Sequence, residues 1–416
     1  MELMNGIIRS LILRRVRKSM LNPLIAAVLV LLAASSLGQV NDGLASTSLT
    51  STASFQPIGQ GPKDSGSVFS RAWGVSLDGT VVGTFLTPSA DGVSFLTHAY
   101  RWTEETSFQD LGTLNPSAQE AEAYAVSDDG SKVVGYARGL SGYQRPFLWT
   151  AASGMQELSK VPGSDAYASG ISNDGSVIVG AFYVNGEGWH AFRWNGKNVT
   201  DLGFLKTGHD KIKKVGNSKG EGVCGLGSAV VGSTVNTSGV QTAFRWDKKL
   251  RMQNLVGVGT NSISYAEDCS DDGSVVVGTS TDDVGDLLAT RWSPTQVLSL
   301  GTLGGNMSES HGSSADGSIV VGGAGLPFVD GVSQFSAFRW SSTTGMEQLS
   351  KVLENLLGVD KVQFCHQLPC APGTWFIDLA LSVSSDGAMI VGTTWDPNLP
   401  APINVEAFRA VVPIAP

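Results

Sequence analysis

The chain has 416 residues, with 28 Lys and Arg against 37 Asp and Glu, and a formal net charge of −9. Beyond the N-terminal segment, basic residues gather only in KTGHDKIKK (206–214), so the sequence lacks the basic surface that nucleic acids require. It also contains no HExxH motif, phosphate-binding loop or dinucleotide fingerprint. We therefore expect no nucleic-acid partner and no cofactor.

The N-terminus has the pattern of a secretory signal peptide, predicted over residues 1–38. An apolar run (24–34) and the small residues SSLG (35–38) follow five basic residues, which are Arg9, Arg14, Arg15, Arg17 and Lys18. The apolar run is shorter than the ~20 residues that a membrane-spanning helix needs. We expect a secreted or periplasmic protein with no membrane span in its mature chain. An uncleaved anchor, a later start and twin-arginine export (Arg14-Arg15) are open alternatives.

Cleavage near Gly38 removes five of the 28 basic residues and one of the 37 acidic residues, which leaves a net charge of −13. A polar linker rich in Ser and Thr (39–53) then leads into the repeats.

Seven copies of one unit occupy the rest of the chain, with a period near fifty residues. Six contain Ser-x-Asp-Gly before an apolar run, as in AVSDDGSKVVG (125–135), and a worn copy reads VCGLGSAVVG (223–232). A line such as AFRW (191–194) follows in every unit, and one such as VTDLG (199–203) follows in all but the last. Asp-Gly between two apolar runs predicts a β-hairpin. Each unit therefore predicts four short strands, placed in the first unit at 71–76, 80–86, 98–103 and 108–113.

Four-stranded units repeated around an axis are the blades of a β-propeller. The last unit ends at 407–412 without a fourth strand, while FQPIG (55–59) is a fourth strand without a unit. If this N-terminal strand completes the last blade, the chain forms a closed, all-β, seven-bladed propeller over 54–413, with an insertion at about 349–376. An open solenoid is the alternative, but it leaves both end pieces unpaired. A monomer is expected.

The repeated residues are assigned to the scaffold. The Asp of each Asp-Gly is a turn former. Phe and Trp two residues apart share one strand face, which predicts packing between blades, and the intervening Arg is expected to contact carbonyls or a carboxylate. The recurring Trp residues are Trp102, Trp149, Trp194, Trp246, Trp292 and Trp340. GNSKG (216–220) resembles a nucleophile elbow, but strands surround it, so we interpret it as chance.

Two columns of the first strands are diverse among the repeats, which predicts that they face something that does not repeat. The first column is Trp73, Tyr124, Ser169, Glu221, Glu267, His311 and Leu381. The second, two residues earlier, is Arg71, Glu122, Tyr167, Lys219, Tyr265, Glu309 and Leu379. First strands line the propeller's central channel, so these columns are candidates for a ligand-binding ring at the channel mouth. The alternative is a solvated rim without function.

Four cysteines in an exported chain predict disulfides rather than a metal site. Cys365 and Cys370 lie in the same insertion, and Cys224 and Cys269 lie in the first strands of adjacent repeats. The second pair requires Cα atoms within ~7 Å. No metal site is predicted.

The lines Ser-x-Asp-Gly-Ser and His-Ala-Phe-Arg-Trp resemble the HAF repeats of bacterial extracellular proteins, most fully at 98–102 and 190–194. The resemblance covers roughly 54–413. It implies export and a repeat fold but supplies no reaction. We therefore expect a non-catalytic binding or scaffold module for a carbohydrate or a surface protein. The alternative is a polysaccharide lyase or hydrolase acting at the channel mouth through Glu221, Glu267 and His311, as acid–base groups or cation ligands.

Overall fold

The computed structural model describes residues 52–205, 216–236, 239–328, 334–358, 363–368, 370–371, 373–395 and 405–414. The expected signal peptide (1–38), nearly all of the linker and the basic cluster 206–214 lie outside these ranges. Within them, no helix is long and apolar enough to cross a membrane.

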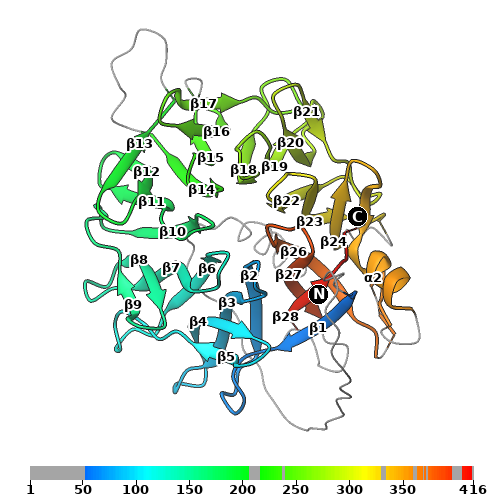
Figure 1. Ribbon diagram of the computed structural model, residues 1–416, viewed down its shortest axis with the longest axis horizontal. Coiled ribbons are helices and arrows are strands. Elements are labelled where there is room, and N and C mark those ends of the chain that lie inside the picture. Colours follow the sequence, from blue (N-terminus) through cyan, green and yellow to red (C-terminus); the bar gives the residue numbers. More distant parts are fainter. Residues whose placement is uncertain are drawn as a thin grey trace, which may run out of the picture. The chain divides into compact units, whose positions relative to one another are not determined.

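Seven four-stranded antiparallel sheets follow one another around a ring, which makes the fold a seven-bladed β-propeller (Figure 1). Blade 1 comprises β2 (Phe69–Val75), β3 (Val81–Pro88), β4 (Phe95–Thr103) and β5 (Ser107–Asp110). Blade 2 comprises β6 (Ala121–Val126), β7 (Lys132–Arg138), β8 (Gln144–Thr150) and β9 (Gly154–Glu157). Blade 3 comprises β10 (Ala166–Ile171), β11 (Ile178–Val184), β12 (Gly188–Trp194) and β13 (Val199–Gly203).

The remaining blades have the same strand order. Blade 4 comprises β14 (Ser218–Cys224), β15 (Ala229–Val235), β16 (Gln241–Asp247) and β17 (Arg251–Leu255). Blade 5 comprises β18 (Ser264–Cys269), β19 (Val276–Thr281), β20 (Leu287–Trp292) and β21 (Val297–Ser299). Blade 6 comprises β22 (Ser308–Ser313), β23 (Ile319–Gly325), β24 (Phe335–Ser341) and β25 (Gly345–Gln348). In each blade the first strand lies nearest the axis of the ring (Figure 1).

Blade 7 closes the ring as predicted. Its strands β26 (Phe376–Val383), β27 (Met389–Trp395) and β28 (Val405–Val411) are completed by β1 (Ser54–Gly59) from the other end of the chain. β1 pairs antiparallel with β28, with Ser54 opposite Val411. Between β25 and β26 lies the one helix of the described residues, α2 (Leu349–Leu357), whose Leu349 and Leu353 are fully buried.

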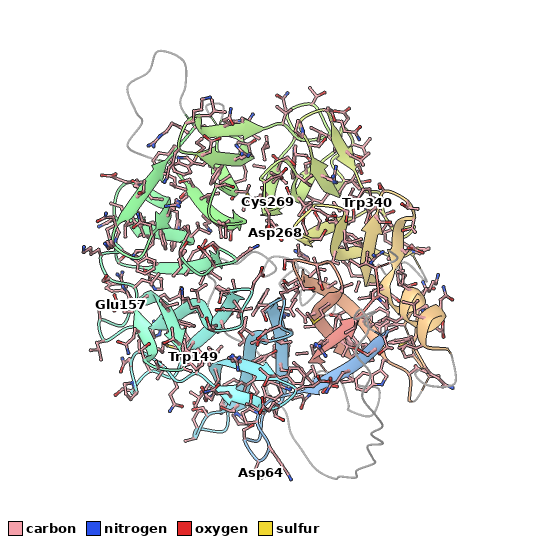
Figure 2. The ribbon with its side chains drawn as sticks, in the orientation of Figure 1. Asp64, Trp149, Glu157, Asp268, Cys269 and Trp340 are labelled. Carbon is pink, nitrogen blue, oxygen red and sulfur yellow. A yellow bond between two sulfur atoms is a disulfide. The ribbon has the colours of Figure 1, made fainter. Side chains whose placement is uncertain are left out.

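The blades pack face to face through apolar clusters that each draw on two neighbouring blades. The cluster between blades 1 and 2, for example, joins Val82 and Ala99 to Phe147 and Trp149. Five of the six recurring Trp side chains are at most 7% exposed, and Trp194 packs against the cluster between blades 2 and 3. Figure 2 labels two of these residues, Trp149 and Trp340. The repeated aromatic residues therefore build the scaffold, as predicted.

The Ser-x-Asp-Gly motif is a self-contained turn. Ser127 Oγ donates to Asp129 Oδ1 (2.6 Å), and the same carboxylate oxygen accepts from the Ser131 N–H (3.0 Å). Gly130 has φ of +65°, a conformation that favours glycine. The Asp of the motif is thus held by its own turn.

In blades 1, 3, 4 and 5 the recurring Arg donates to a turn carbonyl of the next blade. Arg101 donates to the carbonyl of Gly130 (3.1 Å), and Arg245 donates to that of Gly273 (2.9 Å), each reaching the Asp-Gly turn of the following blade. Blade 2 has Leu148 at the Arg position, and there Lys132 donates to the Gly175 carbonyl of blade 3 (3.0 Å). A different strand thus supplies the missing cation.

Candidate functional site at the ring axis

Every first strand contains a β-bulge at the same place. In blade 1 the pairing with β3 skips from Ala72 to Gly74, so Trp73 has no partner in the ladder. The other skipped residues are Tyr124, Ser169, Glu221, Glu267, His311 and Leu381. This set is the first variable column of the sequence. Because a bulge re-aims its side chain, this variable residue is also the one that sheet pairing does not constrain.

Glycine in the second strand makes room for the bulge. A Cβ atom at Gly135 would lie 1.9 Å from the Glu122 carbonyl oxygen, and the corresponding glycine of every other blade has the same contact at 1.9–2.0 Å. The glycine of the repeated Val-Val-Gly is therefore required by the same β-bulge that exposes the variable residue of the first strand.

The axis has two different ends. We call the middle residues of the seven hairpin turns the turn end: Leu77, Asp128, Asn173, Gly225, Asp271, Ala315 and Ser385. The two variable columns form what we call the variable end.

Side chains meet across the axis at the turn end. Asn173 of blade 3 donates to both carboxylate oxygens of Asp271 in blade 5 (3.0 and 3.2 Å), past the side-chain-free Gly225 of blade 4. Burial raises the pKa of Asp128 in blade 2, while a hydrogen bond from Ser385 in blade 7 lowers it and Asp271 raises it. Direct hydrogen bonds already join these side chains across the axis, so the turn end is closed by its own residues, and we take the variable end as the candidate for ligand access.

Blades 1 to 3 contribute an aromatic arc to the variable end. The ring centroids of Trp73 and Tyr124 lie 5.7 Å apart in an edge-to-face contact, and those of Tyr167 and Trp189 lie 5.7 Å apart. A cation lies over each Trp: the Arg71 guanidinium is 4.9 Å from the Trp73 ring centroid, and Lys219 Nζ is 5.4 Å from that of Trp189.

Blades 4 to 6 contribute acidic groups, which we call the acidic arc: Glu221, Glu267 and Glu309, together with His311. Burial raises the pKa of Tyr167 well above its ordinary value, and Glu221 and Glu267 raise it further. Tyr167 belongs to blade 3 and Glu267 to blade 5, so the charge of Glu267 acts on the Tyr167 pKa across blade 4. Tyr265, Glu267, Glu309 and His311 are half-buried. Within the described ranges, no three His, Cys, Asp or Glu side chains are grouped so that they could hold a metal ion.

Two carboxyl groups flank Arg71 and have raised pKa values. Burial raises the pKa of Glu122, against the hydrogen bond from Tyr136 (3.1 Å) and the charge of Arg71. Burial raises the pKa of Asp378 to about 6, against Thr393, Arg71 and Trp395. Arg71 therefore links blade 2 to blade 7 at the variable end.

The sequence analysis did not identify Asp378. A second bulge in β26, between Ile377 and Leu379, leaves this residue outside the ladder. Ile377 takes the fully buried place, and Asp378 stays half-buried. The sequence did mark Asp378 as unusual, because the same position in the other six repeats holds only Ser or Ala. These residues are Ser70, Ala121, Ala166, Ser218, Ser264 and Ser308.

Two motifs that resemble catalytic machinery are structural. Ser218, the Ser of GNSKG, is fully buried, donates to the Gly203 carbonyl (2.7 Å) and accepts from the Ala191 N–H (2.9 Å). In the insertion, His366 contacts Ser350 Oγ through Nδ1 (2.9 Å) and Glu354 Oε2 through Nε2 (2.8 Å). This resembles a Ser-His-acid triad, but Ser350 is fully buried, so the three residues hold the insertion against α2.

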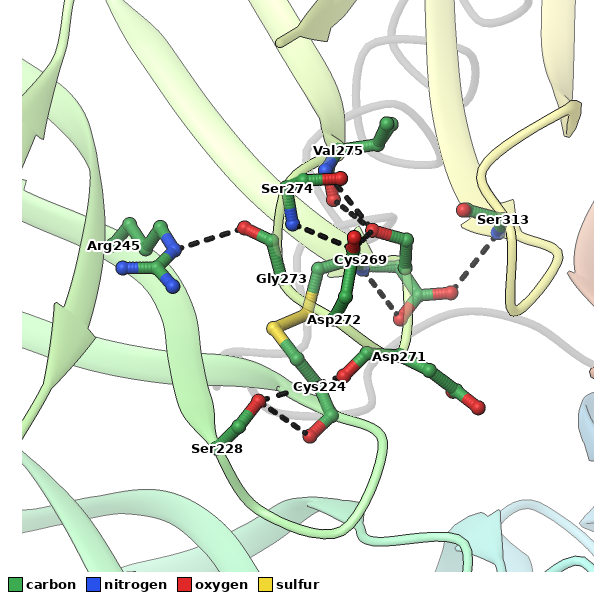
Figure 3. Close-up of a disulfide and its surroundings, with 12 residues drawn as sticks. Cys224, Ser228, Arg245, Cys269, Asp271, Asp272, Gly273, Ser274, Val275 and Ser313 are labelled. Carbon is green, nitrogen blue, oxygen red and sulfur yellow. Dashed lines mark hydrogen bonds between the residues drawn. A yellow bond between two sulfur atoms is a disulfide. The ribbon is translucent and has the colours of Figure 1, made fainter. Parts of the chain in front are cut away.

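Both cysteine pairs are bonded. Cys224 and Cys269 join blades 4 and 5 with Cα atoms 5.4 Å apart (Figure 3), and Cys365 and Cys370 close the insertion loop with Cα atoms 5.5 Å apart. Cys224 occupies the position of the turn Ser in the other blades, since Gly227 N–H donates to its carbonyl as Gly130 N–H does to that of Ser127. Cys269 and its neighbour Asp268 lie at the inner side of blade 5 (Figure 2).

No family model and no curated protein matches the chain. Solved structures do resemble it. The β-propeller domain of the Trilobed protease from Pyrococcus furiosus matches with a TM-score of 0.51 at 8% identity, over 82% of this chain and 94% of that one. An oligogalacturonate lyase in complex with manganese matches with a TM-score of 0.51 at 13% identity, over 87% and 94%. TolB from Acinetobacter baumannii matches with a TM-score of 0.40 at 13% identity, over 80% and 79%. At such identities the first two similarities, each with a TM-score of 0.51, establish the fold alone, and that fold is the β-propeller.

Proposed function

We propose that this protein is an exported, non-catalytic binding module of the HAF-repeat type, which binds a carbohydrate at the variable end of its axis. The observation that carries the proposal is the ring of seven bulges. The same bulge occurs in every blade, yet the seven bulges present six kinds of side chain, which suits a ligand without sevenfold symmetry.

The composition of the ring favours a carbohydrate. Binding sites for small molecules combine aromatic surface with a few placed polar groups. The aromatic arc supplies the half-buried Trp73, backed by the buried Tyr124 and Tyr167. The half-buried Arg71, Glu122 and Glu267 supply planar hydrogen-bonding groups beside it. A surface protein that docks on the same end and on the blade loops is the other partner class.

Export is part of the proposal. The basic and apolar N-terminal pattern and the two disulfides support a secreted or periplasmic location, since such bonds persist in oxidising compartments.

The alternative function is a polysaccharide lyase or hydrolase. The raised pKa values of Glu122 and Asp378, on either side of Arg71, favour it because acid–base catalysts have pKa values near the working pH. These two residues, rather than Glu221, Glu267 and His311 alone, are then the first to test.

The test is to incubate the purified protein with immobilised envelope and plant polysaccharides, measuring retention on each and analysing the supernatant by mass spectrometry. The proposal expects retention on at least one polysaccharide, weakened in Glu267→Gln, with no new oligosaccharide released. Oligosaccharides that disappear in Glu122→Gln or Asp378→Asn would make the protein an enzyme. Retention on no polysaccharide contradicts carbohydrate binding.

A further inference from the structure

Large apolar side chains are exposed on neighbouring loops of blades 5 and 6. These side chains, each between 41% and 82% exposed, are Val256, Ile263, Val284 and Phe328. They belong to a group of four loops, 256–263, 281–286, 301–307 and 325–328, which we call the loop patch. A single exposed apolar residue is ordinary, whereas several on adjoining loops mark a contact surface.

The loop patch lies on the same side of the propeller as the variable end. Each first strand runs from the variable end to the turn end, and neighbouring strands of a blade are antiparallel. Loops that join a second strand to a third, or one blade to the next, therefore return to the variable side. All four loops of the patch are of these two kinds.

Two of the loops are bonded to each other. Ile263 N–H donates to Thr281 Oγ1 (2.9 Å), and Thr281 N–H donates to the Ile263 carbonyl (2.9 Å). Thr260 N–H donates to Asp283 Oδ1 (2.6 Å). These bonds hold the hairpin that presents Val284, so a partner need not pay for ordering it.

The other two loops adjoin this pair. The Asn306 side chain donates to Asp286 Oδ1 (3.4 Å), which connects loop 301–307 to the hairpin of blade 5. Gly305 N–H donates to the Gly325 carbonyl (2.9 Å), which connects the same loop to the one that carries Phe328. The four loops therefore form one continuous surface.

The loop patch is acidic. Asp282, Asp283 and Asp286 surround Val284 in the sequence, and the four loops contain no Lys or Arg. Arg291 is the one Lys or Arg between residues 252 and 338, and it donates to the Gly317 carbonyl at the turn end (3.3 Å). A cation that approaches the patch thus meets carboxylates and no charge of its own sign.

The corresponding hairpin of blade 2 has the apolar residue without the acidic excess. Leu140 is 83% exposed, as Val284 is 82% exposed. Beside it, Arg138 Nε donates to Glu120 Oε2 (2.8 Å), so the charges near Leu140 are paired. The two hairpins therefore separate the effect of an exposed apolar side chain from the effect of charge.

The charge also decides between two kinds of partner. Exposed apolar residues with a polar border mark contacts with proteins or with membranes. Anionic lipid headgroups attract basic surfaces, which disfavours a membrane here. A protein segment that combines aliphatic side chains with Lys or Arg complements both features of the loop patch.

We propose that the loop patch is a docking surface for a basic, partly apolar segment of a partner protein, with Val284 at its centre. This inference goes beyond the proposed carbohydrate binding and does not rest on it. The chemistry of the segment is aliphatic side chains for the exposed Val and Ile, and cations for the three Asp side chains.

The experiment uses two short fluorescent peptides with the same pattern of Leu, one filled in with Lys and the other with Glu. Fluorescence anisotropy measures the affinity of the purified protein for each. Val284→Ser removes the exposed apolar group, and Asp283→Asn removes one charge while keeping an oxygen for the Thr260 N–H. Leu140→Ser is the matched control on the blade 2 hairpin. Melting temperatures check that each variant folds.

We expect the Lys peptide to bind and the Glu peptide not to bind. Val284→Ser and Asp283→Asn should each weaken binding about threefold to tenfold, and Leu140→Ser less than about twofold. No binding of the Lys peptide, equal binding of both peptides, or equal losses in Val284→Ser and Leu140→Ser would overturn the proposal.

Vesicles of phosphatidylcholine and phosphatidylglycerol test the membrane alternative in a flotation assay. Flotation that Val284→Ser abolishes, without binding of the Lys peptide, would make the patch a membrane contact and overturn protein docking. No saccharide enters either assay, so each of these results leaves the carbohydrate proposal standing.

Discussion

The two ends of the propeller axis are built by opposite means. At the turn end the same Ser-x-Asp-Gly turn recurs in six blades, and backbone hydrogen bonds run from one turn to the next, as from Asp128 N–H to the Asn173 carbonyl (3.0 Å). At the variable end every first strand breaks its pairing at one residue, and the seven blades place six kinds of side chain there, with Glu in both blade 4 and blade 5. The comparison teaches that repetition serves the ring itself, whereas the bulge releases one position per blade for another purpose.

Blade 4 is the one blade whose turn lacks the Ser-x-Asp-Gly sequence. Its turn reads Cys224-Gly225-Leu226-Gly227, so the Asp is lost, and the Cys224–Cys269 disulfide replaces the Ser–Asp pair. If the turn end carries stability and the variable end carries binding, changes at each end should affect one property and spare the other.

The largest expected effect is removal of this disulfide. The Cys224→Ala, Cys269→Ala double variant should lose about 4 kcal/mol of unfolding free energy, because the bond closes a loop of 45 residues in the unfolded chain. Urea unfolding measures the loss, and glycan affinity should stay unchanged. The Cys365–Cys370 pair, only five residues apart, is the matched control and should be worth about 2 kcal/mol. Equal losses for the two pairs would contradict the loop argument.

The next effect is a pH-dependent gain from Asp378→Asn. The folded-state pKa is about 6, above the ordinary 3.8, so between these values the folded protein holds a proton that the unfolded chain releases. The unfolding free energy of the wild type therefore falls as pH rises from about 4 to about 6. The variant lacks this penalty and should be more stable by about 1–3 kcal/mol at pH 8, with no gain at pH 3. Urea unfolding at both pH values measures this, and parallel pH profiles for the two proteins would refute it.

A smaller loss is expected for Arg245→Met, which removes the donor to the Gly273 carbonyl and the ion pair with Asp247 (2.7 Å). The side chain is partly exposed, so we expect about 1–2 kcal/mol in urea unfolding, without a change in glycan affinity. The control is Lys249→Met on the same hairpin, which is exposed and should change stability by less than about 0.5 kcal/mol. A loss of affinity in Arg245→Met would remove the distinction between the two ends.

The smallest stability effect is expected for Glu267→Gln, within about 0.5 kcal/mol, because this bulge residue lies outside the ladder. Its glycan affinity should nevertheless fall about fivefold, roughly the worth of one hydrogen bond. Asp272→Asn at the turn of the same blade is the matched opposite: it should cost stability, since Asp272 accepts from Ser270 Oγ (2.7 Å), and leave affinity intact. A loss of stability in Glu267→Gln, or a loss of affinity in Asp272→Asn, would contradict the assignment of binding to the variable end and stability to the turn end.

Features that repeat could be predicted from the sequence, because a period reveals them. Six Asp-Gly hairpins, the worn fourth copy and the stray strand at 55–59 were enough for the ring and its closure. The variable column from Trp73 to Leu381 could be found by aligning the repeats with one another. Only the structure shows that each of these residues lies in a bulge, and that Gly135 and its counterparts are glycine because of it.

Features that occur once were beyond the sequence. Lys132, on the second strand of blade 2, makes the contact that Arg makes elsewhere. The repeat pattern could not predict it, because no other repeat places the cation on that strand. Asp378 stands in a column of Ser and Ala, but only the backbone shows that a second bulge turns it away from the buried position. Contacts across the axis, such as Asn173 with Asp271, join blades that the repeat pattern treats as independent.

The strand that closes the ring also sets the order in which the protein can be completed. Ser54 is among the first residues of the fold to be synthesised and Val411 among the last, and they are paired. Blades 1 to 6 consist of consecutive strands and can form as the chain emerges, whereas blade 7 must wait for both ends. The pairing of β1 with β28, which has the highest sequence separation, therefore forms last, and the closed ring is complete only when it has formed. A chain held partway through a membrane pore would carry an unpaired β1 edge until its final strand arrived.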